Sequence, residues 1–135
     1  MSVYVPARLR RRVAERAGGR CEYCLLPGRL RRSPPEVDHV RPLKLGGRTA
    51  FANLALACRR CNAAKGTNIA AYDPLHDEPA FLFDPRRQAR GEHFRLRRGL
   101  LVPLTASARA TAALLSLNAA DAQVLRYLEE DELSG

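Results

Sequence analysis

Four cysteines form two Cys-x-x-Cys pairs, Cys21 with Cys24 and Cys58 with Cys61. Thiolates three positions apart in a tight turn can face one ion, and two such turns supply the four soft ligands of a closed tetrahedral zinc site. Such a site leaves no position open for water, so this Zn²⁺ ion is predicted to be structural and not catalytic. In a reducing cytoplasm, metal ligation is favoured over disulfides for pairs of this kind.

The two pairs enclose 33 residues, more than the roughly 15 to 20 of a plain zinc loop. Asp38 and His39 lie inside this segment, and Asn62 follows directly on Cys61. Carboxylate and amide oxygens suit a hard divalent ion, and histidine titrates near neutral pH. One base that deprotonates water and one cation that absorbs phosphate charge suffice to hydrolyse a phosphodiester. Neighbouring strand residues point to opposite faces, so Asp38 and His39 meet only where the strand twists or ends, as Pro42 predicts.

Positive charge is concentrated in the cysteine half of the chain. The net charge is +9, and residues 1–66 carry 15 basic and 4 acidic side chains while residues 67–135 carry 8 and 10. Of the 23 basic residues, 21 are arginine, whose planar guanidinium can hold a phosphate with two parallel hydrogen bonds. A polyanion is therefore the expected partner, although for any single arginine the alternative is a solvated surface charge.

The 135 residues are enough for one domain of ordinary size. No run of 18 apolar residues occurs, and the N-terminal residues lack a charged region followed by an apolar run. The sequence therefore predicts a cytoplasmic protein with no membrane partner and no small-molecule substrate.

Turn and capping residues divide the chain into predicted elements. Pro6 opens a basic helix that Gly18 ends, and Pro42 cuts off a short strand. Thr105 offers a capping oxygen to a later helix. The predicted elements are a helix over about 6–17, a loop over 21–35, a strand over 36–40 that ends near residue 39, a return segment over 51–57, a helix over 59–64, a polar turn-rich connector over 72–78 with a brief buried piece at 81–83, a hairpin of 94–96 with 100–104, a helix from 105 to about 117 and a last helix over about 119–133.

The motifs together resemble the zinc-stapled HNH endonucleases, and the resemblance covers about residues 21–66. The matched positions are Cys21, Cys24, Glu36, Asp38, His39, Pro42, Leu43, Gly46, Gly47, Asn53, Leu54, Leu56, Cys58, Cys61, Asn62, Lys65 and Gly66. Parts of the segment 83–118 are also similar to the tail of one prokaryotic branch of that family. The resemblance implies an α+β fold with a small ββα-metal core.

The resemblance also implies a role for each central residue. His39 would be the general base, Asp38 with Asn62 would hold one divalent ion, and Asn53 would orient the loop that carries the histidine. The chain departs from the family's name because the third position is Asn62 and not histidine. An amide oxygen is a harder ligand than imidazole, so Mg²⁺ or Mn²⁺ is expected there.

Further side chains are candidates for contact with nucleic acid or for support. For Glu36, a supporting hydrogen bond or ion pair is as well favoured as metal ligation, and His76 and His93 are expected to pack or bond at the surface. The predicted phosphate contacts are Arg31, Arg32, Arg41, Arg59, Arg60 and Lys65, together with arginines 8, 10, 11, 12 and 29.

The predicted organisation is a nuclease core over residues 1–66 and an extension over 67–135 that packs on it as part of a single compact domain. The predicted function is a metal-dependent endonuclease acting on DNA, expected to be double-stranded. A non-catalytic zinc-ribbon module that binds nucleic acid is the main alternative. A thiol-redox protein, in which the cysteine pairs cycle through disulfides, is the third.

Overall fold

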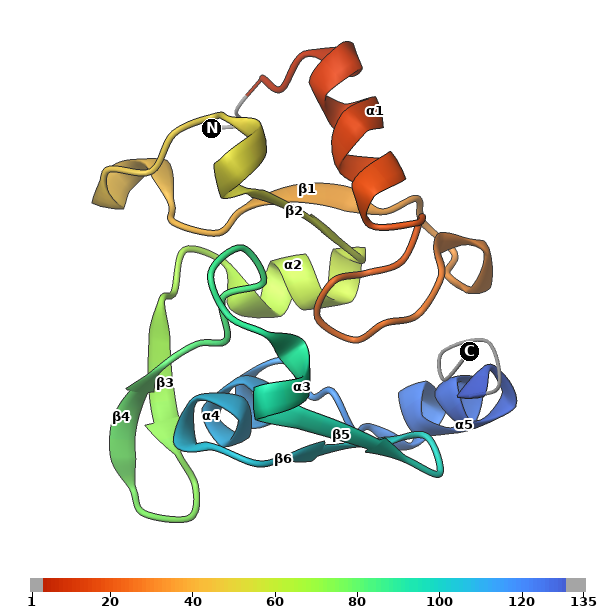
Figure 1. The fold of residues 1–135 in the computed structure, drawn as a ribbon, viewed down its shortest axis with the longest axis vertical. Coiled ribbons are helices and arrows are strands. Elements are labelled where there is room, and N and C mark those ends of the chain that lie inside the picture. Colours follow the sequence, from red (N-terminus) through yellow and green to blue (C-terminus); the bar gives the residue numbers. More distant parts are fainter. Residues whose placement is uncertain (1–3, 131–135) are drawn as a thin grey trace.

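The computed structural model describes residues 4–130. Helix α1 (Ala7–Arg16) lies on one face of the antiparallel hairpin of β1 (Glu36–His39) and β2 (Leu54–Ala57), and α2 (Arg59–Lys65) lies on the other, as Figure 1 shows. This is the ββα arrangement expected from the sequence. Mixed α and β elements with short antiparallel hairpins make up the rest of the described chain.

Strand β2 is buried on both faces, and its side chains pack alternately into two hydrophobic clusters. Leu54 and Leu56 pack with Val13 of α1, whereas Ala55 and Ala57 join the main core with Cys61 of α2. The register pairs residue 38 with residue 55 and residue 39 with residue 54. Because paired residues share a face, the side chains at 38 and 39 start on the α2 and α1 faces respectively.

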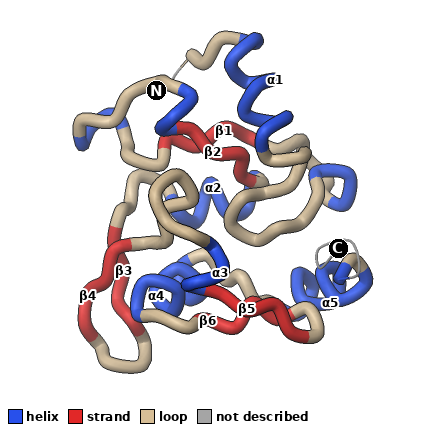
Figure 2. Tube along the Cα trace, viewed as in Figure 1, coloured by secondary structure: helices blue, strands red, loops and turns tan. Residues whose placement is uncertain are grey.

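The second half of the described chain carries two more hairpins and three helices (Figure 2). The elements are β3 (Ala70–Asp73), β4 (Glu78–Phe81), α3 (Arg90–His93), β5 (Phe94–Arg97), β6 (Leu100–Pro103), α4 (Ala106–Leu114) and α5 (Ala120–Leu128). Helix α4 packs on both strands of the β3–β4 hairpin and on β6, and α5 packs on β6.

Most predicted elements are confirmed, and three details are corrected. The connector predicted over 72–78 lies in the β3–β4 hairpin, which the sequence pattern does not indicate because its strands hold a proline and no β-branched residue. Of the piece predicted to be buried at 81–83, Phe81 is exposed at the end of β4, and only Leu82 and Phe83 are buried. Helix α4 ends at Leu114, earlier than predicted, where Ser116 adopts a left-handed conformation with φ of 51°. The predicted end of the last helix lies outside the described residues.

Two arginines of the second half bond to the first cysteine turn. Arg90 donates to the carbonyl oxygens of Glu22 and Tyr23 at 2.8 and 2.7 Å, and Arg126 donates to that of Cys24 at 3.2 Å. Arg126 is fully buried, with an exposed fraction of 0%. Three consecutive carbonyls of the first cysteine turn are thus held by side chains that follow residue 66. Within residues 4–130, none of the helices has the length and apolar character needed to span a membrane.

Candidate metal centre and active site

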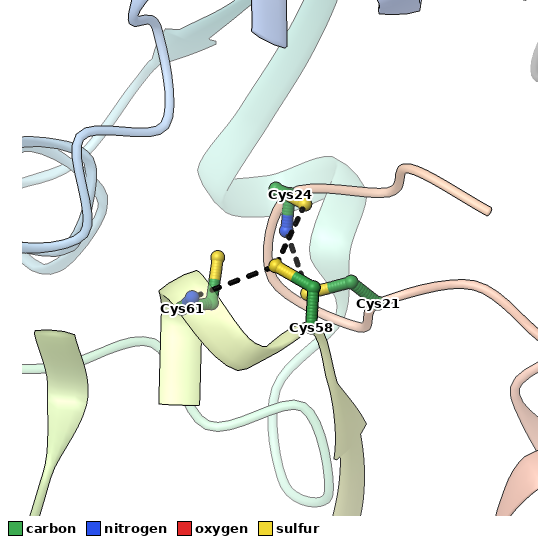
Figure 3. A group of neighbouring side chains, drawn as sticks. All are labelled: Cys21, Cys24, Cys58 and Cys61. Atoms are coloured by element: carbon green, nitrogen blue, oxygen red, sulfur yellow. Dashed lines mark hydrogen bonds between the residues drawn. The ribbon is translucent and has the colours of Figure 1, made fainter. Parts of the chain in front are cut away.

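The four cysteines converge as their spacing predicts. Their sulfur atoms all lie within 4.8 Å of one another, and all four side chains are buried (Figure 3). The Sγ atoms of Cys24 and Cys58 are 3.8 Å apart, which equals the separation of about 3.8 Å that a tetrahedral ion with Zn–S bonds of about 2.3 Å imposes. The four cysteines can therefore hold a metal ion, and a structural zinc fits the donor set.

Local hydrogen bonds preorganise this cluster. The backbone N–H of Cys24 points at Sγ of Cys21 at 3.4 Å, and that of Cys61 points at Sγ of Cys58 at 3.5 Å. Cys58 is also the N-cap of α2, so one thiol both caps the helix and lies among the other three sulfur atoms. The hydrogen bond with Cys21 lowers the pKa of Cys24 to about 7, and hydrogen bonds from the other thiols lower the pKa of Cys58 far below its ordinary value.

A second centre lies beside the end of β1. A cleft of about 310 Å³ is lined by Asp38, His39 and Asn62, together with residues of the loop after β1 and of the end of α2. The structure thus brings the three predicted residues together, although 38 and 39 begin on opposite faces of the strand. Among the described residues, only the cysteine cluster gathers three or more His, Cys, Asp or Glu ligands, so this cleft offers a cation fewer protein ligands.

His39 is half-buried and is held through one ring nitrogen. Its Nε2 lies 2.9 Å from the hydroxyl oxygen of Thr49. No described group engages Nδ1. Burial lowers the pKa of His39, and the nearby Lys65 ammonium lowers it further while Asp38 raises it, with a net decrease. The imidazole is therefore neutral at neutral pH, which is the form that accepts a proton.

Asp38 is buried and bonded at both carboxylate oxygens. The Tyr23 hydroxyl donates to Oδ2 at 2.7 Å, and the Lys65 ammonium donates to Oδ1 at 3.2 Å. Burial raises the pKa of Asp38, while Lys65 and Tyr23 oppose that rise. A carboxylate has about four lone-pair positions, so a cation reaching it from the cleft can share an oxygen with these donors.

Asn62 of α2 is oriented by a side chain of β1. Its amide nitrogen donates to Oε1 of Glu36 at 2.8 Å, so Glu36 has the supporting role that was one of its two predicted roles. Within the described part of the chain, no hydrogen bond engages Oδ1 of Asn62. The carboxamide oxygen is therefore the atom that Asn62 can offer to a ligand in the cleft.

Asn53 fixes the loop between His39 and Thr49. Its Oδ1 accepts from the backbone N–H of Arg41 at 2.9 Å, and its amide nitrogen donates to the carbonyls of Arg41 and Arg48 at 3.0 and 2.8 Å. A Cβ at Gly47 would lie 1.7 Å from the carbonyl oxygen of Arg41, so the loop closes only with glycine there. These contacts match the loop-orienting role expected of Asn53.

Lys65 corrects a prediction. It was expected to contact phosphate, but its side chain is only 2% exposed, and its ammonium also donates to the carbonyls of His39 and Val40 at 3.3 Å each. The Lys65 side chain faces β1 and not the solvent, so Lys65 positions Asp38 and the backbone beside His39.

The predicted arginine contacts divide between exposed and engaged side chains. Arg32, Arg41 and Arg59 are exposed, in keeping with the prediction. Arg60 binds both oxygens of Asp121 at 3.0 and 2.9 Å. Arg31 is half-buried with its guanidinium 3.9 Å from Sγ of Cys24, so it serves the cysteine cluster in place of a phosphate.

The remaining histidines bond as expected for residues outside the site. Nδ1 of His76 lies 3.1 Å from Oδ2 of Asp73, which Arg109 also binds through both oxygens. Nδ1 of His93 lies 2.7 Å from the hydroxyl of Thr105.

Comparison with known families bears on this geometry directly. Residues 21–68 match the family described as HNH endonuclease. This stretch is an HNH endonuclease domain. The match covers both cysteine pairs and every residue that lines the cleft except Val5, and it supports a nuclease or nucleic-acid-binding role. Comparisons with curated proteins and with solved structures gave no match.

Sequence reasoning missed three supporting side chains of the HNH domain. Tyr23 lies between the first two cysteines and reaches Asp38, Thr49 reaches His39, and Lys65 reaches Asp38 from α2. The signal for Tyr23 is its aromatic ring, because a buried tyrosine usually pairs its hydroxyl with a hydrogen-bond partner. Thr49 carried none, since its position depends on the path of the loop.

Proposed function

We propose that the chain is a metal-dependent endonuclease that hydrolyses DNA phosphodiester bonds in the cleft beside the end of β1. The observation that carries this proposal is the placement of Asp38, His39 and Asn62 on the wall of one cleft inside an HNH domain. A base and two hard oxygen donors around one space are the parts that phosphodiester hydrolysis requires.

His39 acts as the general base. Thr49 holds the imidazole at Nε2, which leaves Nδ1 to take a proton from the attacking water. The lowered pKa keeps the ring neutral at neutral pH, so the base is ready before substrate arrives. Asn53 supports this geometry through the loop that carries both His39 and Thr49.

Asp38 and Asn62 hold a divalent ion through a carboxylate oxygen and an amide oxygen. Two hard oxygen ligands suit Mg²⁺ or Mn²⁺, which keep several waters when bound to protein. When bound, the ion stabilises negative charge on the phosphate and the leaving oxygen. Lys65 and Glu36 fix the orientation of the two ligands from the other side.

The cysteine cluster holds zinc and has a structural role. Cys61 and Asn62 are adjacent on α2, so an ion that pins Cys61 also sets the position of Asn62. Four buried ligands leave no place for a reacting water. We further propose a cytoplasmic location and double-stranded DNA as a substrate. We also propose that the chain is a single folded unit in which residues 67–135 complete the core. The bonds of Arg90 and Arg126 to the first cysteine turn support this last proposal.

Nicking of supercoiled plasmid tests the catalytic assignment. With Mg²⁺ or Mn²⁺ present, His39→Ala is expected to lose about 10²- to 10⁴-fold in rate, the range for removal of a general base. His76→Ala is the matched control, because His76 lies in an exposed turn and bonds to a structural aspartate. Equal nicking by wild type and His39→Ala would remove His39 as the base.

A nucleic-acid-binding module without catalysis is the second candidate. The bond between Lys65 and Asp38 favours it, because a buried ammonium on one oxygen of Asp38 opposes the approach of a second cation. This function predicts salt-sensitive binding with no metal-dependent product. Wild-type protein that binds nucleic acid but gives no product with Mg²⁺ or Mn²⁺, together with an Asp38→Asn variant that keeps the fold and binds like wild type, would support it.

A further inference from the structure

A trough larger than the cleft lies beside it. About 1050 Å³ in volume, it runs between α1 and the segment from Pro27 to Val37, and neither the proposed mechanism nor the family match gives it a role. Its lining is largely apolar and includes Ala7, Ala14 and Leu56. We name it the α1 trough.

The α1 trough leads to the candidate active site. Val5 and Val37 line both the trough and the cleft that contains His39. Strand β1 therefore borders both spaces, with Glu36 at the trough and His39 at the cleft. The trough and the cleft therefore adjoin at Val5 and Val37.

The arginines of α1 fall into two groups. Arg12 and Arg16 lie over the Phe51 ring, with 4.3 and 3.8 Å between guanidinium carbon and ring centroid, and Arg16 also donates to backbone carbonyls. Arg10 and Arg11 line the trough, are exposed, and make no side-chain hydrogen bond or ion pair within residues 4–130. The first group anchors the helix, and the second is available to a ligand.

Charge and surface character identify the ligand. Three arginines and one acidic residue line the trough. Arg29 binds both carboxylate oxygens of Glu129, and Glu36 accepts a hydrogen bond from Asn62, which leaves Arg10 and Arg11 for a ligand. These two arginines suit phosphates, and the alanine, proline, valine and leucine side chains of the lining offer apolar contact to unpaired bases. A duplex stacks its bases inside and gains nothing from such a lining, whereas a single strand gains from both.

We propose that the α1 trough binds a single nucleic-acid strand that flanks the scissile phosphate, with Arg10 and Arg11 contacting its phosphates. The inference rests on the proposed nuclease function and refines its substrate, which becomes a nucleic acid with an unpaired stretch next to the cut. The strand is DNA, in keeping with the proposed function, and preference for RNA is an outcome of the test.

Binding in a His39→Ala background tests the trough separately from cleavage. The probes are fluorescently labelled oligothymidylate, oligouridylate and a DNA duplex, measured by anisotropy over a range of salt concentrations. The double variant Arg10→Gln/Arg11→Gln is expected to weaken single-strand binding about tenfold and to reduce the slope of log affinity against log salt by about 1.4, or about 0.7 for each phosphate contact. Comparison of the two single-stranded probes separates DNA from RNA as the ligand.

The matched control removes the same charge at the other end of the molecule. Arg95→Gln/Arg97→Gln changes two exposed arginines of β5, which lies far from α1 in Figure 1, and should alter affinity less than about twofold. Ala7→Glu places a negative charge in the trough and should also weaken single-strand binding.

Distinct outcomes separate this inference from the proposed function. An equal loss in both arginine pairs would show general charge attraction and overturn the trough assignment, as would a loss confined to the duplex probe. If wild type fails to nick plasmid but the Arg10/Arg11 effect on single strands is present, the nuclease proposal falls and the trough remains a binding site. If wild type nicks and the Arg10/Arg11 variant binds like its parent, the trough assignment alone falls.

Discussion

The cysteine cluster and the active-site cleft share helix α2 but differ in how their polar groups are satisfied. Every thiol of the cluster is buried and surrounded by the other three. In the cleft, Nδ1 of His39 and Oδ1 of Asn62 have no hydrogen-bonding partner within the described chain. Cys61 belongs to the cysteine cluster, and the adjacent residue Asn62 lines the cleft. A closed site thus lies at the start of the helix that contributes Asn62 to an open site.

Loss of one cluster ligand should have the largest effect. Cys58→Ser removes a metal ligand and changes the N-cap of α2, so bound zinc and the folded core are expected to be lost together. Metal analysis and circular dichroism would measure both. A folded Cys58→Ser protein with wild-type thermal stability would show that the cluster is not the scaffold.

Removal of the buried ammonium should have the next largest effect. Lys65→Met leaves Asp38 without its ion-pair partner, and breaking a buried pair in this way costs about 3–5 kcal/mol in the free energy of unfolding. Urea denaturation would measure the loss. The double variant Asp38→Asn/Lys65→Met should recover much of it, and a single-variant loss below about 1 kcal/mol would mean that the pair is not buried as described.

Release of the catalytic loop should cost less stability and still impair nicking. Asn53→Ala removes three hydrogen bonds to the backbone of Arg41 and Arg48, so we expect a loss of about 1–3 kcal/mol in the free energy of unfolding. The nicking rate should fall as well, because the loop positions Thr49 against His39. Asn68→Ala, at an exposed position, is the matched control. A slower rate in both variants would argue against a specific role for the loop.

The pH dependence should give the smallest effect. Only neutral His39 accepts a proton, so the nicking rate should rise as pH increases through the pKa of His39. Burial lowers that pKa from its ordinary value of 6.5, so the midpoint should lie below 6.5 and the rate should be level at neutral pH. A pH–rate profile at constant metal concentration would measure it, and a midpoint above 6.5 would contradict the environment described for His39.

Local patterns in the sequence predicted the parts of the fold that depend on local chemistry. The cysteine spacing predicts the cluster, Pro42 predicts the end of β1, and Thr105 predicts the start of α4, where its side chain accepts from the N–H of Ala108 at 3.1 Å. Ligand spacing and capping act within a few residues, so a sequence displays them directly.

Features set by tertiary packing could not be read in this way. Lys65 carries the same charge whether it faces phosphate or a buried carboxylate, and only the docking of α2 on β1 decides which. In the sequence, Arg126 is indistinguishable from a surface arginine, but in the structure it is buried and donates to the carbonyl oxygen of Cys24. The β3–β4 hairpin depends on α4 for a packing partner, so its strands need little intrinsic strand preference.

Independent substitution of the two metals tests the division between scaffold and catalyst most directly. Protein would be refolded with either Cd²⁺ or Zn²⁺ in the cysteine cluster. Each form would be assayed for plasmid nicking with Mg²⁺, with Mn²⁺, or with neither ion in a buffer that contains a chelator. Metal analysis after each reaction would verify the ion in the cluster. We predict that the rate follows the second ion and is the same for both cluster ions. A rate that follows the cluster ion and is indifferent to Mg²⁺ and Mn²⁺ would contradict the account.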